Sequence, residues 1–257
     1  MMIPRIAIPQ SRSNKPDYVA RVMPYYLDAI RLAGGEPVEI ALELDSHQIA
    51  RTASACDAVL LPGNPADVNP EKYGAERDPH TAADDPLRDN VDELLLQDAY
   101  SLRKPILGVC YGLQAINVWR TGTLLQHIAT SVCHTNPPGA SSPLPEHAVV
   151  IDAASKLAEI VRASGTEARG IDWRDVRGEY AKFLEITVNS SHHQAAMRPG
   201  DGLRAVAWCR DDGVIEALEG TGDHWLIAVQ WHPERMVGEA SAQALFRALV
   251  KAARRGH

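Results

Sequence analysis

The chain has 257 residues, and its 26 Lys and Arg against 33 Asp and Glu give a net charge of −7. Hydrophobic residues make up 45% and charged residues 23%, a globular composition that excludes a disordered chain. The acidic balance argues against nucleic-acid or anionic-membrane partners, and no apolar run reaches the roughly 18 residues of a membrane span.

In the first half of the chain, short apolar strands alternate with helical patterns. The strands are predicted at 3–9, 37–42, 57–61 and 106–109. The helices are predicted over 18–33, from the cap Asp85 followed by Pro86, and from about Leu113. The apolar face of the second helix is predicted to be Leu87, Val91, Leu94, Leu95 and Leu102. This alternation predicts a mostly parallel sheet with helices on both faces.

The second half is richer in strands. They are predicted at 149–151, 183–189, 203–209, 214–219 and 226–230, before a final helix at 241–253. The third and fourth of these form a β-hairpin around Asp212-Gly213. Because no repeat or linker interrupts the chain, we expect one domain over 1–257.

Two segments, 64–90 and 131–146, fit neither a helix nor a strand. Long irregular segments in a compact domain are often functional lids. A solvated surface loop is an equal alternative for each. The N-terminus lacks the pattern of a signal peptide, so we expect a cytoplasmic protein.

Four cysteines, Cys56, Cys110, Cys133 and Cys209, lie far apart in the sequence. Their spacing argues against a zinc or redox pair, and a chain of this length without a secretory signal does not predict disulfides. Three are predicted to be structural, although Cys133, in the proline-rich segment, could approach a site. The fourth, Cys110, has a different context.

Cys110 lies in Gly108-Val109-Cys110-Tyr111-Gly112, between a short apolar strand and a helix. This is the context of a nucleophile elbow, in which the two glycines leave room where a side chain would meet the adjoining strand or helix. The helix N-terminus favours the thiolate, the reactive form of cysteine. The alternative is a buried structural thiol.

A candidate base follows the last predicted strand, in Gln230-Trp231-His232-Pro233-Glu234. His232 and Glu234 are two residues apart, so the ring and the carboxylate can meet. We expect Glu234 to orient His232, and His232 to hold Cys110 as the thiolate and to protonate a leaving amine. The alternative is an ordinary surface histidine.

The elbow with Gln114, combined with His232-Pro233-Glu234, resembles the class I glutamine amidotransferases. That resemblance implies a flavodoxin-like three-layer sandwich and a Cys–His–Glu triad. More of the chain, from about residue 3 to about residue 250, resembles the γ-glutamyl-γ-aminobutyrate hydrolase group. The segments that carry this narrower resemblance are 26–30, 33–37, 61–70, Tyr73-Gly74, Asp89, 188–194 and Asp212-Gly213.

The resemblance also implies an oxyanion hole made by the backbone N–H groups of Gly63 and Tyr111, and each such donor is worth about 3 kcal/mol of transition-state stabilisation. It further implies five substrate contacts, from Gln114, Asn189, Ser190, His192 and Gln194. For the last four, ordinary turn chemistry after a strand is the alternative.

The sequence departs from the hydrolase pattern at three places. Tyr111 stands where the group usually has Arg, the segment 119–123 has larger residues than usual, and His193 replaces a usual glycine. These changes leave the identity of the leaving group open.

The leading hypothesis is a γ-glutamyl hydrolase that acts on a small γ-glutamyl substrate, as in polyamine and putrescine catabolism, through a thioester on Cys110. This chemistry needs no cofactor, and the sequence shows no phosphate loop, dinucleotide fingerprint or metal-spaced cluster. One alternative is a glutaminase subunit that supplies ammonia to a synthetase partner. Another is a non-enzymatic binder or redox sensor, which His232 and Glu234 argue against. The oligomeric state, a homodimer included, stays open.

Overall fold

The computed structural model describes residues 2–136, 143–174 and 180–254. The strands are β1 (Arg5–Pro9), β2 (Glu36–Ile40), β3 (Ala58–Leu61), β4 (Ile106–Val109), β5 (Thr123–Leu125), β6 (Glu146–Asp152), β7 (Arg169–Arg174), β8 (Tyr180–Asn189), β9 (Ala195–Arg198), β10 (Leu203–Cys209), β11 (Ile215–Gly220) and β12 (Leu226–Val229). The helices are α1 (Pro16–Leu32), α2 (Ser46–Ser54), α3 (Pro86–Ser101), α4 (Tyr111–Trp119), α5 (Lys156–Ser164) and α6 (Ala240–Ala253), with 3-10 turns η1 (Pro70–Tyr73) and η2 (Pro233–Arg235).

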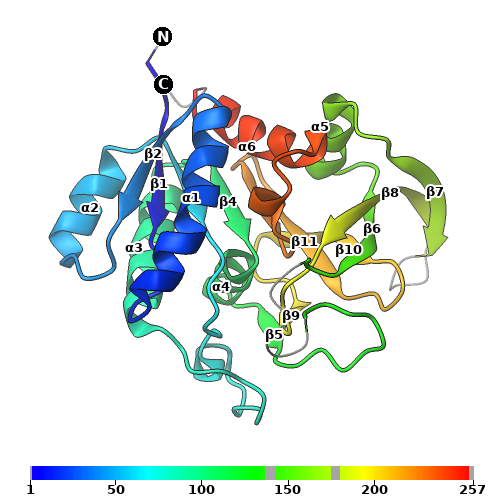
Figure 1. The fold of residues 1–257 in the computed structure, drawn as a ribbon, viewed down its shortest axis with the longest axis horizontal. Helices are drawn as coiled ribbons and strands as arrows, with labels where there is room; N and C mark the ends of the chain where they lie inside the picture. The colour runs from blue at the N-terminus through cyan, green and yellow to red at the C-terminus, as the bar shows by residue number, and fades with distance from the viewer. Residues whose placement is uncertain (1, 137–142, 175–179, 255–257) are drawn as a thin grey trace.

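One mixed sheet runs through the molecule in the order β2-β1-β3-β4-β12-β11-β10-β6-β8-β7 (Figure 1). The strands from β2 to β12 pair in parallel, and those from β12 to β7 pair antiparallel. The strands β5 and β9 form a separate two-stranded sheet. In the parallel half of the large sheet, the carboxyl ends of β3, β4 and β12 lie next to one another. Parallel sheets of this kind bind ligands at the carboxyl ends of their strands.

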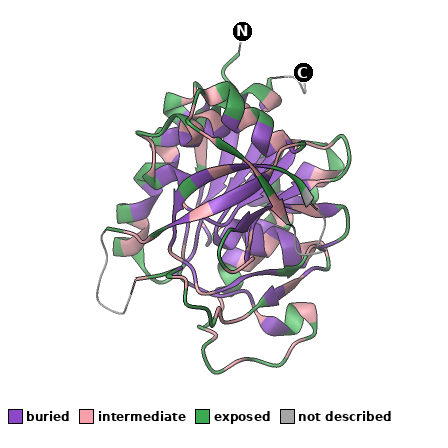
Figure 2. Ribbon diagram, turned by 90° about the vertical axis from the view of Figure 1, so that its right-hand side faces the viewer, coloured by how far each residue is buried: buried purple, intermediate pink, exposed green. Residues whose placement is uncertain are grey.

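Helices cover both faces of the sheet. On one face α1, α5 and α6 pack through side chains such as Tyr26 and Phe246. On the other, α2, α3 and α4 pack through side chains such as Leu95 and Leu113. Figure 2 shows the buried strands between these two layers. The predicted three-layer α/β sandwich is confirmed. Among the residues described, no helix combines the length and apolar character that a membrane span requires.

The predicted apolar face of α3 is wrong at both ends. Leu87 is 42% exposed and Leu102 is 59% exposed, whereas Arg88 and Asp92 are buried. The reason is that the Arg88 guanidinium is fully paired: it donates to Asp92 Oδ1 at 2.7 Å and to the Pro62 carbonyl at 2.6 Å. A buried charge with such partners replaces a leucine on the helix face and ties α3 to the end of β3.

The two elbow glycines are required by close packing. A Cβ atom on Gly112 would lie 2.2 Å from the carbonyl oxygen of Leu61, and one on Gly108 would lie 2.7 Å from Cδ1 of Ile116. The first contact joins backbone to backbone, so no rotamer change relieves it. The close approach of α4 to β3 therefore depends on Gly112.

We expect Gly112→Ala to lower the free energy of unfolding by about 3 kcal/mol, because the added methyl group forces α4 away from β3. Gly222→Ala is the matched control, since nothing lies within 4 Å of its Cβ position. Urea unfolding followed by circular dichroism measures both. Equal stability of the two variants would contradict this account of the elbow.

Candidate active site

Cys110 occupies the turn between β4 and α4, at the carboxyl end of the parallel strands. Its backbone has φ 53° and ψ −106°, a left-handed conformation that costs a non-glycine residue about 1–3 kcal/mol. The surroundings hold it there: its N–H donates to the Val229 carbonyl at 2.8 Å, and its carbonyl accepts from Leu113 and Gln114. The side chain is 6% exposed and borders a cavity.

His232 follows β12, whose pairing with β4 brings it to the same edge of the sheet. Its Nδ1 lies 2.8 Å from Oε1 of Glu234, which is 2% exposed. A Cβ atom on Gly63 would lie 3.2 Å from Cε1 of His232 and 3.6 Å from Cβ of Cys110. The ring and the thiol therefore border the same small space, and the carboxylate acceptor at Nδ1 leaves Nε2 for the thiol.

The charges around His232 favour the imidazolium ion. Burial by itself lowers the pKa of this ring, but the charges of Glu234 and Cys110 outweigh burial and raise the pKa to about 10. This direction of the pKa shift favours the protonated ring at neutral pH. A protonated histidine beside a cysteine stabilises the thiolate.

Asn189, predicted as a substrate contact, holds the backbone of His232. Its Nδ2 donates to the His232 carbonyl at 2.9 Å, and its Oδ1 accepts from the His232 N–H at 2.8 Å. The two bonds fix the turn between β12 and η2 against the end of β8. The sequence gives no local signal for this contact, because the partners are far apart along the chain.

The cavity at Cys110 has a volume of about 270 Å³. Its other lining residues are Tyr18, Val22, Asn64, Pro65, Thr135, Asn136, Leu144, Ser191, His232, Glu234 and Arg235. Both irregular segments, 64–90 and 131–146, therefore contribute to its wall, although 137–142 of the second lies outside the described residues. Cys133 is exposed and is not among the lining residues, and all four cysteines are free.

Four further predicted substrate contacts are buried beside this cavity but do not line it. Gln114 donates to the Gln194 carbonyl at 3.1 Å, and Ser190 donates to the His134 carbonyl at 2.7 Å. Gln194 donates to the Gln126 carbonyl at 3.0 Å, and His192 contacts the Gln194 carbonyl through Nδ1. Their contact with a substrate stays a prediction.

The two amides predicted for the oxyanion hole differ in their partners. The Gly63 N–H donates to the buried Tyr26 hydroxyl at 3.0 Å, a contact that sequence reasoning missed. The Tyr111 N–H is at the first position of α4, where the helix itself supplies no acceptor. Both amides lie beside Cys110. The Gly63 N–H already has the Tyr26 hydroxyl as its acceptor, whereas the Tyr111 N–H has no acceptor within α4.

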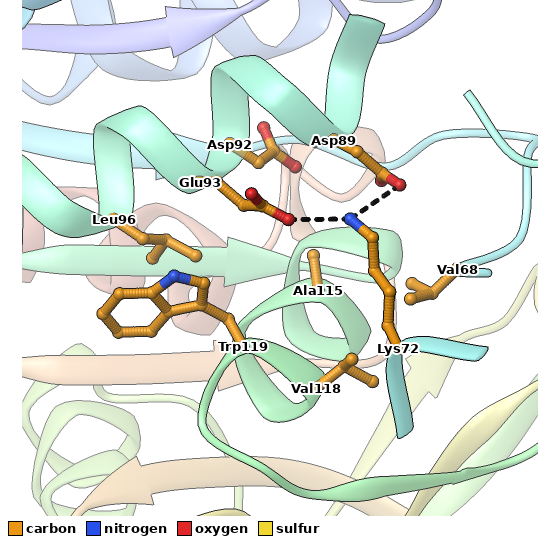
Figure 3. Close-up of a pocket in the computed structure, with 9 residues that line it drawn as sticks. All are labelled: Val68, Lys72, Asp89, Asp92, Glu93, Leu96, Ala115, Val118 and Trp119. Atoms are coloured by element: carbon orange, nitrogen blue, oxygen red, sulfur yellow. Dashed lines mark hydrogen bonds and ion pairs between the residues drawn. The ribbon is translucent and has the colours of Figure 1, made fainter. Parts of the chain in front are cut away.

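The side chain of Tyr111 is turned away from the cavity. Its hydroxyl donates to Asp89, and its ring packs against the Arg88 guanidinium at 5.1 Å. Asp89 in turn pairs with Lys72 at 2.9 Å, in a second cavity of about 230 Å³ between η1, α3 and α4 (Figure 3). Tyr111 thus anchors the start of α4 where the hydrolase group usually has an arginine.

The raised pKa of His232 makes its contribution to stability pH-dependent. Its folded pKa of about 10 exceeds the unfolded value of about 6.5, so the contribution is complete below pH ~6.5 and is lost as the pH rises through ~10. We expect the unfolding free energy of the wild type to fall toward that of His232→Gln over this range. The exposed His47→Gln should keep the wild-type profile. If the unfolding free energies of the wild type and of His232→Gln changed with pH in parallel, the raised pKa would not belong to His232.

Residues 4–234 match the family described as Peptidase C26. A Mycobacterium tuberculosis protein, named provisionally as a glutamine amidotransferase, is 34% identical over 251 residues, which cover 95% of this chain and 71% of that one. The gamma-glutamyl-gamma-aminobutyrate hydrolase PuuD of Escherichia coli K12 is 28% identical, over 88% of this chain and 84% of that one. The Trypanosoma brucei CTPS glutaminase domain with bound acivicin has the same fold, with a TM-score of 0.60 at 16% identity over 99% of this chain and 94% of that one. The chain belongs to the Peptidase C26 family, within the class I glutamine amidotransferase-like proteins.

Proposed function

We propose that this protein hydrolyses the γ-amide bond of a small γ-glutamyl compound, of the γ-glutamyl-γ-aminobutyrate type, to glutamate and an amine. The observation that carries the proposal is the constellation at the cavity: a cysteine on a strained turn, beside a histidine paired with a buried carboxylate. The similarity to a named hydrolase of this bond type supports the choice of substrate class.

In the first half of the reaction, the Cys110 thiolate attacks the γ-carbonyl carbon and a C–S bond forms. His232 gives the proton on Nε2 to the amide nitrogen, the C–N bond breaks, and the amine leaves. A γ-glutamyl thioester remains on Cys110. Glu234, on Nδ1, holds the ring in place and stabilises its positive charge at the start of the cycle.

In the second half, the neutral His232 takes a proton from water, and the hydroxide attacks the thioester carbonyl. The C–S bond breaks, glutamate leaves, and the thiolate–imidazolium pair is restored. The Tyr111 N–H stabilises the oxyanion in both halves, and the Gly63 N–H joins it on exchanging the Tyr26 hydroxyl for the substrate oxygen.

Arg235 supplies a positive charge for a substrate carboxylate. Besides His232, it is the cationic side chain among the described residues that line the cavity. The chain as a whole carries −7, so an anionic substrate needs such a local partner. Because Tyr111 is turned away, we assign to Arg235 the contact with a carboxylate on the leaving amine.

A glutaminase that supplies ammonia to a partner is the second candidate, because relatives of this chain carry the name glutamine amidotransferase. The two functions share Cys110, His232 and Glu234. They differ in the leaving group, which is ammonia for the glutaminase and a larger amine for the hydrolase. A panel of amides therefore separates them.

We expect the protein to release glutamate faster from γ-glutamyl-γ-aminobutyrate than from glutamine, a γ-glutamyl peptide or a folate polyglutamate. Cys110→Ser should lower the rate by about 10³-fold or more, whereas Cys133→Ser, at an exposed thiol, should leave it unchanged.

Arg235→Met should raise KM for γ-glutamyl-γ-aminobutyrate more than for γ-glutamylputrescine, whose amine has no carboxylate.

Coupled detection of glutamate measures all four proteins. Glutamine as the one good substrate would favour the glutaminase, and release by Cys110→Ser at the wild-type rate would exclude the mechanism.

A further inference from the structure

Three histidines converge on one carboxylate outside the catalytic cavity. Glu216, on β11, is completely buried, and its Oε1 lies 3.1 Å from Nε2 of His147, 3.5 Å from Nε2 of His192 and 3.6 Å from Nδ1 of His134. The side chains of the three histidines are between 2% and 3% exposed. The proposed mechanism uses none of these four residues, which we term the histidine–glutamate cluster.

The hydrogen bonds of two rings fix where their protons lie. Nε2 of His134 is 2.8 Å from the Asp212 carboxylate, and Nδ1 of His192 is 3.0 Å from the Gln194 carbonyl. Both partners accept only, so each ring carries its proton on that nitrogen. The opposite nitrogens, Nδ1 of His134 and Nε2 of His192, face Glu216 and make no hydrogen bond to any described residue.

With both rings neutral, two lone pairs and a carboxylate meet in the protein interior. Such groups repel one another where the dielectric constant is low, unless a cation lies between them. The nitrogen of His134, the nitrogen of His192 and a carboxylate oxygen of Glu216 lie within 4.8 Å of one another. Tetrahedral zinc with bonds of about 2.0–2.2 Å spaces its ligands ~3.4 Å apart, close to the distances from Glu216.

The outer partners match those of metal-binding histidines. A histidine that binds a metal usually donates its other ring N–H to a carboxylate or a backbone carbonyl, which fixes its orientation. Asp212 does so for His134, and the Gln194 carbonyl does so for His192. The set of two imidazoles and one carboxylate is typical of zinc and its neighbours in the transition series.

We propose that His134, His192 and Glu216 bind one divalent transition-metal ion, with Zn²⁺ as the ion to test first. His147 supports the site by donating from Nε2 to Glu216. The ligands come from three separate segments of the chain, so the spacing of residues along the sequence gives no sign of the site.

A metal ion at this site would link the segments around His134 and His192, which contribute residues to the wall of the catalytic cavity. The Ser190 hydroxyl and the His192 N–H both donate to the His134 carbonyl, at 2.7 and 2.9 Å. Thr135, next to His134, and Ser191, next to His192, line the cavity. The ion therefore has a structural role, and its binding does not depend on which amide the enzyme cleaves.

The test is metal binding by the full-length protein after removal of metals with a chelator. We expect the stripped protein to bind one Zn²⁺ per chain in competition with a chromogenic chelator, and to rise in Tm. Co²⁺ should give the visible absorption bands of a tetrahedral site with nitrogen and oxygen ligands. His192→Ala and Glu216→Gln should lower the affinity by at least about 100-fold, and Asp212→Asn by about 10–100-fold. The exposed His47→Ala is the control and should bind as the wild type does.

Circular dichroism shows whether each protein is folded, and Asp212→Asn keeps the test usable if a ligand variant does not fold. A stripped wild type that is folded but binds neither Zn²⁺ nor Co²⁺ would overturn the proposal. It would show that protonated histidine rings, and not a metal ion, balance the charge of Glu216. Unchanged affinity in folded Glu216→Gln and Asp212→Asn would overturn it as well, because the ion would then bind elsewhere.

Discussion

The close approach of α4 to β3 is the constraint on which the site depends. Gly112 lies so near the Leu61 carbonyl that the two backbones almost touch, and α4 therefore begins beside the end of β3, next to the turn where Cys110 takes its left-handed conformation. The same contact places Gly63, two residues after Leu61, beside the thiol. Pairing of β4 with β12 then brings His232 to the same edge. One packing contact and one strand pairing thus assemble the residues proposed for the chemistry.

Paired buried charges keep this arrangement in place. Arg88 donates to the Pro62 carbonyl, and so holds the turn that follows β3. Asn189 holds the backbone of His232, and Glu234 holds its ring. The Arg88–Asp92 and His232–Glu234 pairs both lie in the interior, where loss of one partner leaves an uncompensated charge. Buried partners therefore hold the backbone of Cys110 and the ring of His232, while other residues that line the cavity come from irregular segments.

Local sequence was enough to predict the strand–turn–helix around Cys110 and the contact between His232 and Glu234. Gly108, Cys110 and Gly112 sit in one strand–turn–helix unit, and the bounds predicted for β4 and β10 are those observed. Interactions between distant segments could not be predicted. The predicted buried face of α3 was wrong because Arg88 finds partners on other elements. The helix α2 was not predicted, because only Ile49 and Ala53 of its nine residues are buried and the apolar pattern is therefore weak. The histidine–glutamate cluster arises in the same way, from four segments that meet only in the fold.

We propose that Cys110 carries a γ-glutamyl thioester during turnover. Rapid acid quenching of the protein with γ-glutamyl-γ-aminobutyrate, followed by peptide mass spectrometry, tests it directly. We expect a mass increase of one glutamyl group on the peptide that contains Cys110, and no such increase with Cys110→Ser. Glutamate release accompanied by an adduct on another residue, or undiminished in Cys110→Ser, would contradict it.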